Sequence, residues 1–287
     1  MPSFKEQLAE KLKDKLSEEE LKLLPTGFQT IGEIVILNLK PELSKHEKVI
    51  GEAVIELLPR SRTVCVRTGA ITGKYREPQL KVIAGKDETE TIHLENNCKY
   101  KLDIKKLMFA KGNVSERARL SRLVASGEVI VDMFAGIGYF SVPLGKLSKA
   151  GKIYSIEWNP DAFYYLNENI KLNKIENVET FFGDNREIVP KLIEKGIKAD
   201  RIVMGLLPPP KDFIETALSI SKKGTIIHYE DILSSDESKR EEEIEKTLAY
   251  FKEEAGKKGM KVELLHVQRV KGYAPKLEHY VLDIKVI

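Results

Sequence analysis

Acidic residues stand at the ends of apolar stretches, at spacings that suit the binding of a nucleoside. The segment VDMFAGIGYFS (131–141) begins as an apolar strand and turns through Gly136 and Gly138 toward a helix. Glycines suit such a turn because a Cβ there would keep a nucleotide from lying against the backbone. The strand KIYSIE ends at Glu157, 19 residues after Gly138, and a third strand ends at Asp184, 27 residues further on. These strand ends predict one binding site at a common edge of a sheet.

Each carboxylate has a role in holding an adenosine. Glu157 can grip a ribose diol because one carboxylate accepts from two hydroxyls, and Asp184 can accept from an exocyclic amine. Ser141 replaces the third glycine of a G-x-G-x-x-G loop, and no G-x-x-x-x-G-K-[ST] loop occurs, which disfavours a ligand with phosphates. The pattern therefore favours S-adenosylmethionine. The structural alternative is that Glu157 and Asp184 only cap the helices that follow them.

The residues that would act on the second substrate are less distinct. The segment RIVMGLLPPP (201–210) follows the fourth strand, where many enzymes that modify amino groups on bases carry Asn or Asp before two prolines, but here Gly205 is followed by leucine. His228 and Tyr229 end the fifth strand and are weak catalytic candidates, with a structural histidine as the alternative. No Ser-His-Asp, H-E-x-x-H or Cys/His metal spacing occurs, so the catalytic group stays open and no metal is expected.

Hydrophobic periodicity divides the chain into two parts. Residues 1–110 predict an α+β domain, whose helices and short strands we place at 4–16, 17–24, 31–37, 46–59, 63–67, 79–84, 91–95 and 99–104. Residues 111–287 predict strands that alternate with helices, which means a mostly parallel, doubly wound α/β sheet. The helix at 114–125 is expected to have Ser115 as its N-cap. The last two strands, 262–270 and 279–286, are expected to form an antiparallel edge ribbon.

Composition bounds the class of protein. The chain has 287 residues and a formal net charge of +3, with 42% hydrophobic and 32% charged residues, which is typical of a globular protein. No apolar run approaches ~18 residues and the N-terminus has no apolar signal region, so no membrane association is expected. Cys65 and Cys98 are the only cysteines, which suits a reducing cytoplasm.

Positive charge is concentrated in one stretch. Residues 60–122 contain 15 Lys and Arg against 7 Asp and Glu. Such an excess suits a polyanion partner, although a solvated surface explains it equally well. The residues expected to contact phosphates are Arg60, Arg62, Lys74, Arg76, Lys105, Lys106 and Lys111.

Longer motifs carry a resemblance to a known family. Residues 73–119, 132–144, 159–178 and 272–286 resemble the superfamily of tRNA guanosine-37 N1-methyltransferases and wybutosine-synthesis enzymes. The methyltransferases show Asn-Leu-Pro where this chain has MGLLP, and commonly a Val where this chain has Asn185. Both departures match the other branch, the tRNA wybutosine-synthesizing protein 2 family.

The resemblance implies an activity. Members of that family transfer the 3-amino-3-carboxypropyl group of S-adenosylmethionine to C7 of 4-demethylwyosine at position 37 of phenylalanine tRNA. The expected fold is a Rossmann-like S-adenosylmethionine-dependent transferase domain preceded by a smaller α+β domain, and a monomer is compatible with the sequence. The rival interpretations are a guanosine-37 N1-methyltransferase and an inactive tRNA-binding module.

The expected cofactor-binding residues combine the motifs above with this resemblance; they are Ser115, Arg122, Phe134, Gly136, Gly138, Glu157, Trp158, Asp184 and Asn185. Ser115, Arg119 and Arg122 share one face of the predicted helix. We expect Arg122 to hold the methionyl carboxylate, because a guanidinium can bind a carboxylate through two parallel hydrogen bonds. The alternatives are that Arg122 contacts tRNA phosphates or that Arg119 faces the cofactor.

Overall fold

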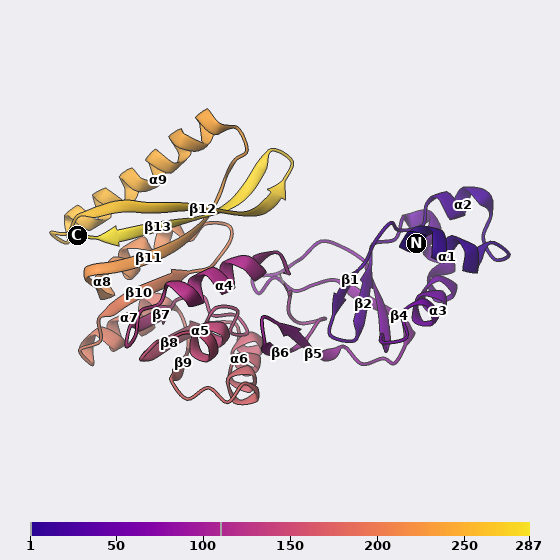
Figure 1. Ribbon diagram of the computed structural model, residues 1–287, viewed down its shortest axis with the longest axis horizontal. Helices are drawn as coiled ribbons and strands as arrows, with labels where there is room; N and C mark the ends of the chain where they lie inside the picture. Colours follow the sequence, from indigo (N-terminus) through magenta and orange to yellow (C-terminus); the bar gives the residue numbers. More distant parts are fainter. Residues whose placement is uncertain (1, 110) are drawn as a thin grey trace. The chain divides into compact units, whose positions relative to one another are not determined.

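The protein is described here by a computed structural model, which covers residues 2–109 and 111–287. The chain forms two compact units (Figure 1). The N-terminal unit contains residues 1–95 and 99–109, and the C-terminal unit contains residues 96–98 and 110–287.

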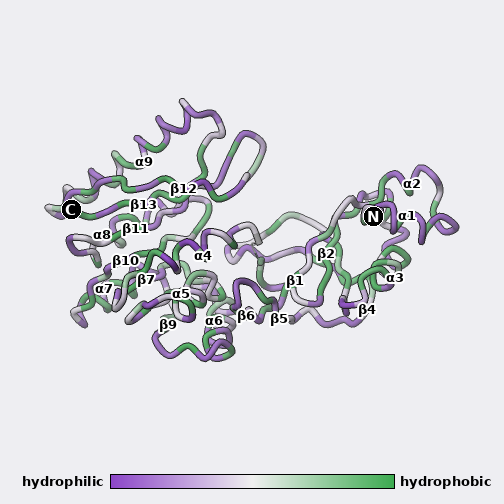
Figure 2. The backbone as a smooth tube through the Cα atoms, in the orientation of Figure 1, coloured by the Kyte–Doolittle hydropathy of each residue, from purple (hydrophilic) through white to green (hydrophobic). Residues whose placement is uncertain are grey.

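The N-terminal unit is an α+β structure, and Figure 2 shows β2 and α3 as mainly hydrophobic. Its four-stranded sheet has the order β1-β2-β3-β4, in which β2 and β3 are parallel, and β5 and β6 form a separate pair. Capping boxes begin the first two helices, at Ser3 with Glu6 and, as predicted, at Ser17 with Glu20. The elements are α1 (Phe4–Leu12), α2 (Glu18–Lys22), β1 (Gln29–Ile31), β2 (Ile34–Leu37), η1 (Pro41–His46), α3 (Glu47–Leu57), β3 (Thr63–Arg67), β4 (Leu80–Gly85), β5 (Glu90–Glu95) and β6 (Cys98–Asp103).

The C-terminal unit is built on a seven-stranded sheet of order β12-β13-β11-β10-β7-β8-β9. Strands β11, β10, β7, β8 and β9 are parallel, and β13 runs antiparallel to both of its neighbours. The elements are η2 (Lys111–Asn113), α4 (Val114–Leu123), β7 (Val129–Asp132), α5 (Ser141–Leu147), β8 (Lys152–Glu157), α6 (Pro160–Leu172), β9 (Val178–Phe182), α7 (Asn185–Glu194), β10 (Ala199–Met204), η3 (Lys211–Phe213), α8 (Ile214–Ile220), β11 (Ser221–Ser234), α9 (Glu237–Lys257), β12 (Val262–Ala274) and β13 (Leu277–Val286). The predicted doubly wound fold with an antiparallel edge ribbon is confirmed.

Helices cover both faces of this sheet. Ile130 and Val203 pack with Leu120 of α4 and Leu144 of α5. Their strand neighbours point to the other face, since side chains alternate along a strand. There Val131 and Ile202 belong to the larger core, which includes residues of α7, α8 and α9. The carboxyl ends of β7, β8 and β10 therefore open at one edge between two helical layers.

One local prediction is corrected by the structure. Helix α4 begins at Val114, and its N-cap is Asn113 rather than Ser115, which lies in the first turn. The physical reason is that the 3₁₀ turn η2 runs directly into α4. The helix thus starts without a side-chain cap, since the side chain of Asn113 makes no capping hydrogen bond.

Candidate functional site

The glycine loop between β7 and α5 has the conformation that its sequence predicts. Gly136 and Gly138 have φ angles of +56° and +94°, in the region that side chains other than glycine rarely adopt. A Cβ on Gly136 would lie 2.8 Å from the ring of Tyr139, and a Cβ on Gly138 would lie 2.7 Å from Cγ2 of Val142. Both glycines are therefore required for the loop to turn this tightly.

Glu157 holds this loop from the end of β8. Its Oε2 accepts a hydrogen bond from the amide of Gly136 at 2.7 Å, and its Oε1 accepts from the amide of Asn159 at 2.7 Å. Burial raises the pKa of Glu157, and the hydrogen bonds from the backbone amides oppose that shift in part. Helix α6 is capped by Asn159, so Glu157 does not cap it, and its two hydrogen bonds to backbone amides join the loop to the end of β8.

Asp184 is a helix cap as well as a candidate ligand. Its Oδ1 accepts from the amide of Arg186 at 2.8 Å as the N-cap of α7, and its Oδ2 forms an ion pair with Arg186 at 2.6 Å. The hydrogen bonds from Arg186 lower the pKa of Asp184 below its ordinary value, although burial opposes them. Asp184 is therefore charged at neutral pH, which suits an acceptor of an amine.

Asn185 connects this third strand end to the glycine loop. Its side chain is buried, and its amide nitrogen donates to the carbonyl of Met133. Among the residues that the structure describes, its Oδ1 has no hydrogen-bond partner. The segments that follow β7 and β9 are thus tied together, as a shared ligand site requires.

Asp132 is the buried acid at the end of β7. The hydroxyl of Ser141 donates to its Oδ2 at 2.6 Å and lies 2.7 Å from the hydroxyl of Ser155. Burial is the main reason that the pKa of Asp132 rises to about 7, and the hydrogen bond from Ser141 opposes the rise. The carboxyl group anchors the first turn of α5 under the loop.

Two aromatic side chains flank the carboxylates. Trp158 follows Glu157 directly and is 47% exposed. Phe134 lies within the glycine loop, and its ring meets that of Phe213 edge to face with a centroid distance of 5.1 Å.

Gly205 follows β10 and lies against the ring of Phe140. A Cβ built on Gly205 would be 2.6 Å from Cε2 of Phe140, a side chain that is itself buried in the α4–α5 core. Any larger residue at position 205 requires the ring to move. The asparagine that is missing from this position is therefore incompatible with the observed packing.

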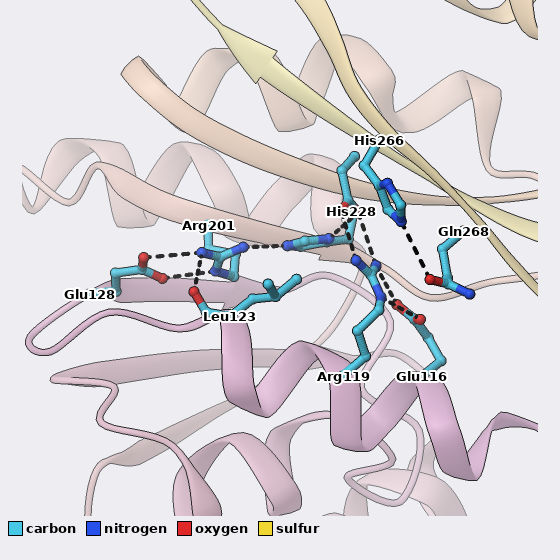
Figure 3. Close-up of polar contacts among 9 residues, drawn as sticks. Glu116, Arg119, Leu123, Glu128, Arg201, His228, His266 and Gln268 are labelled. Atoms are coloured by element: carbon cyan, nitrogen blue, oxygen red, sulfur yellow. Dashed lines mark hydrogen bonds and ion pairs between the residues drawn. The ribbon is translucent and has the colours of Figure 1, made fainter.

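A chain of charged side chains connects α4 to the ribbon side of the sheet (Figure 3). Arg119 donates to both carboxylate oxygens of Asp283, at 2.8 and 3.1 Å, and to both of Glu116, at 2.7 and 2.8 Å. His228 links Asp283 to Arg201, at 2.5 and 2.6 Å. Burial alone would raise the pKa of Asp283, but hydrogen bonds from His228 and Arg119 outweigh it and hold that pKa below its ordinary value.

The chemistry of this chain fixes the tautomer of His228. A guanidinium can only donate, so Nε2 of His228 accepts from Arg201 and Nδ1 donates to Asp283. Burial lowers the pKa of His228, which keeps the ring neutral. The histidine therefore transmits a hydrogen bond between two charged groups.

His228 and Tyr229 do not face the mouth of the site, which corrects the sequence-based expectation. His228 is 2% exposed, and Tyr229 is fully buried with its ring edge to face against Phe251, at 5.2 Å. Alternation along β11 sends the two side chains to opposite faces of the sheet, and each face is covered by helices. Both are positioned to support the fold, and neither is open to a substrate.

Arg122 is also placed differently from the prediction. The carbonyl of its neighbour Leu123 accepts from Arg201, which also pairs with Glu128 at the start of β7. This end of α4 thus lies at the amino edge of the sheet, opposite the glycine loop, and Arg122 is exposed there. Arg119, the alternative, is engaged with Asp283 and Glu116.

Sequence reasoning missed Arg117, which lies at the other end of α4. This side chain is only 1% exposed, and its guanidinium carbon is 4.8 Å from the ring centroid of Tyr139 in the glycine loop. Its spacing to Leu120 and Val124, at i+3 and i+7, is the signal that would have placed Arg117 on the buried face. Ser115 is near the same end of α4 and is exposed.

The residues expected to contact phosphates lie mainly at the surface. Arg60, Lys74, Lys105 and Lys106 are exposed, whereas Arg62 is half-buried and forms ion pairs with Glu33 and Glu88. Arg76 is half-buried as well, and the side chain of Lys111 is outside the described part of the chain.

Metal-ligand clusters and membrane-spanning helices are both absent from the described residues. No group of three or more His, Cys, Asp or Glu side chains is arranged to hold a metal ion within residues 2–109 and 111–287. Over the same residues, no helix is both long and apolar enough to cross a membrane.

The parallel sheet, the glycine loop and the acidic strand ends define the C-terminal unit as a Rossmann-like domain of the S-adenosylmethionine-dependent transferase class. Two family models match the chain: the TYW2 N-terminal domain over residues 8–89 and the TRM5/TYW2 methyltransferase domain over residues 91–264. The chain belongs to the TYW2 family within the TRM5/TYW2 superfamily.

Individual relatives agree with this assignment. The chain is 40% identical over 284 residues to the tRNA(Phe) (4-demethylwyosine(37)-C(7)) aminocarboxypropyltransferase of Pyrococcus horikoshii, covering 99% of this chain and 97% of that protein. It is 38% identical to the tRNA (guanine(37)-N(1))-methyltransferase Trm5b of Pyrococcus abyssi, covering 94% of this chain and 77% of that protein. The crystal structure of P. horikoshii TYW2 in complex with MeSAdo superposes with a TM-score of 0.83 at 37% identity, covering 99% of both chains.

Proposed function

We propose that this protein transfers the 3-amino-3-carboxypropyl group of S-adenosylmethionine to C7 of 4-demethylwyosine at position 37 of tRNA(Phe), releasing methylthioadenosine. The observation that carries the proposal is the Glu157–Gly136 hydrogen bond at the glycine loop, in a chain that matches the P. horikoshii aminocarboxypropyltransferase over 99% of its length. The absence of a side chain at Gly205 supports this reaction over methyl transfer to guanosine.

The reaction needs alignment more than acid–base chemistry. A sulfonium activates each of its three carbon neighbours, and the enzyme selects one by placing it in line with the nucleophile. The bond from C7 to the γ-carbon forms as the S–Cγ bond breaks, its electron pair goes to sulfur, and the proton on C7 is then lost. The positive sulfur becomes a neutral thioether, so no metal is required.

The site residues supply binding and orientation. Glu157 accepts from the ribose hydroxyls and Asp184 from the adenine amine, while Phe134 and Trp158 border the base. Gly136, Gly138 and Asn185 shape the backbone around it, and Ser115 lies at the α4 end of the site. In this arrangement Arg117 replaces Arg122 as the guanidinium that holds the methionyl carboxylate, because only Arg117 lies beside the glycine loop.

The partner that we propose is tRNA(Phe), recognised in part by the exposed basic residues of the N-terminal unit. Arg60, Lys74, Lys105 and Lys106 are exposed, so their positive charges are accessible to phosphates. Cys65 and Cys98 are buried thiols, which supports a reducing cytoplasm as the place of the reaction.

One incubation tests the activity. The protein is mixed with tRNA that contains 4-demethylwyosine and with S-adenosylmethionine labelled either in the methyl or in the carboxypropyl group. We expect the carboxypropyl label in tRNA and methylthioadenosine in solution. Methyl label in tRNA together with S-adenosylhomocysteine would identify a guanosine-37 methyltransferase instead, and no consumption of the donor would identify an inactive tRNA-binding protein.

A further inference from the structure

Glu230 occupies a position at the carboxyl edge of the sheet that the cofactor motifs do not include. Strand β10 ends at Met204, whose register partner on β11 is Tyr229. Glu230 is therefore the first residue of β11 beyond the end of β10, level with the segment that begins at Gly205. On its other side Glu230 pairs with Val281 of β13.

The carboxylate of Glu230 is buried and incompletely satisfied. The residue is 4% exposed, and its Oε2 lies 3.3 Å from Nε2 of His279, which is fully buried. Among the described residues, neither Oε1 of Glu230 nor either ring nitrogen of His279 has a hydrogen-bond partner. A buried carboxylate oxygen without a donor is costly, so these groups are expected to bind a donor that completes the site.

Positive side chains lie around this pair. The charges of Glu230 and Arg117 both act on Lys271, whose pKa is lowered mainly by burial. Lys271 packs over Gly112, just before α4, where a Cβ would be 2.5 Å from its Nζ. Alternation along β11 places Glu230 on the same face as His228, which is the face that α4 covers. One acid and two cations thus meet between α4 and the ribbon.

The position suits the far end of an extended donor. Glu157 on β8 and Glu230 on β11 are separated by three strand spacings, which is about 14 Å. Two carboxylate side chains and a nucleoside with a three-carbon arm between them can cover that span. The arm of S-adenosylmethionine ends in an ammonium and a carboxylate, which matches one acid beside two cations.

We infer that Glu230, supported by His279, accepts hydrogen bonds from the α-ammonium of S-adenosylmethionine, while the donor's carboxylate lies toward Arg117 and Lys271. This inference rests on the proposed function and adds to it. An ammonium fixed by Glu230 holds the transferred arm on the β11 side of the sheet, so that the γ-carbon rather than the methyl group faces the base.

Calorimetric titration of Glu230→Gln and of wild type tests the inference with three ligands whose sulfur is an uncharged thioether. These are S-adenosylhomocysteine, its decarboxylated analogue, which keeps only the ammonium, and methylthioadenosine, which has neither group. We expect the variant to bind the first two about tenfold more weakly and methylthioadenosine as wild type does, because a charge-assisted hydrogen bond is lost. Glu278→Gln is the matched control, since Glu278 pairs with Arg269 near the surface of the same ribbon and should change nothing.

The contrary outcomes are specific. An equal loss of affinity for all three ligands, or no loss for the two that carry the ammonium, would overturn the inference. If Glu230→Gln does not fold, the test uses the wild type alone. The inference then requires that the wild type bind the decarboxylated analogue more tightly than methylthioadenosine. Failure of the proposed function has a different signature, since the labelled incubation would then give S-adenosylhomocysteine with methyl label in tRNA, or no consumption of the donor, whatever Glu230→Gln does to the affinities.

Discussion

The two halves of the large sheet hold their carboxylates by different means. On the β7–β9 half, Glu157 and Asp184 accept from backbone amides, of which those of Asn159 and Arg186 are two residues away in sequence. On the ribbon half, side chains bind one another across the fold, and Arg119 and Asp283 are 164 residues apart. Backbone amides are fixed once a strand and a loop form, whereas the ion pairs between side chains form only after α4 and β13 come together.

This difference predicts different consequences of substitution. Loss of Glu157 or Asp184 removes a ligand contact and one or two short-range hydrogen bonds to backbone amides. Loss of one member on the ribbon half leaves a buried charge without its partner, which is among the costliest changes in a folded protein.

The largest effect is expected for Arg119→Ala. The substitution leaves the buried carboxylates of Glu116 and Asp283 without their ion pair to Arg119. We therefore expect the free energy of unfolding to fall by about 3–5 kcal/mol. Urea denaturation followed by circular dichroism measures the change. A loss below about 1 kcal/mol would mean that the carboxylates are solvated and that the two halves do not differ in this way.

The next effect concerns pH and Asp132. Because the folded pKa of about 7 lies above the unfolded value, the unfolded chain loses this proton first as pH rises, and stability is lost between about pH 4 and pH 7. We expect Asp132→Asn to remove this loss. The free energy of unfolding of Asp132→Asn relative to wild type should therefore be higher at pH 8 than at pH 4, by about 4 kcal/mol at most. Asp200→Asn is the control of opposite sign, since the ion pair with Lys222 lowers the pKa of Asp200 despite partial burial. Parallel stability curves for wild type and Asp132→Asn would refute the assignment.

Smaller effects, measured on ligand binding, are expected for Glu157→Ala and Asp184→Ala. Each removes a charge-assisted hydrogen bond to the donor, worth about 1.5–3 kcal/mol or roughly 10- to 150-fold in affinity. Calorimetry with S-adenosylmethionine measures the loss, and circular dichroism should show an unchanged fold. Unchanged affinity in both variants would place the ligand elsewhere.

The smallest effect is expected for Arg122→Ala. This side chain is exposed at the amino edge of the sheet, so stability should change by no more than about 0.5 kcal/mol and S-adenosylmethionine affinity should not change. Arg117→Ala, at the opposite end of the same helix, should lower the affinity for S-adenosylmethionine but not the affinity for methylthioadenosine. A tenfold loss of affinity in Arg122→Ala would restore the original assignment of the carboxylate.

The half of the site that was predictable from sequence is the half made of local contacts. The glycine loop and the strand end at Glu157 depend on residues close along the chain, as does the capping box at Ser17 in the N-terminal unit, and each is found where the pattern predicts it. The buried chain from Arg201 through His228 was not predictable, because its partners come together only through the sheet order. Hydrophobic periodicity shows which residues share a helix face, but it does not show against which other element that face packs.

Arg122 illustrates a topological signal that periodicity misses. A helix that precedes a parallel strand runs antiparallel to it, so the N-terminal end of α4 must lie at the carboxyl edge where the ligand binds. That rule selects Arg117 over Arg122 before any coordinates are known. Helical spacing placed Arg122 on one face with Ser115 and Arg119, and it did not single out Arg117.

The placement of β13 between β11 and β12 has a consequence for biosynthesis. The final strand of the sheet is an interior strand, so the growing polypeptide cannot close the contact between Asp283 and Arg119 until that strand has been translated. The N-terminal unit has all of its residues by position 109. At a synthesis rate of about 5–20 residues per second, roughly 10–35 s separate the two events. During that interval the nascent protein carries a complete first domain and an unfinished catalytic sheet, which makes α4 and the open edge of β11 the surfaces that need protection from premature association.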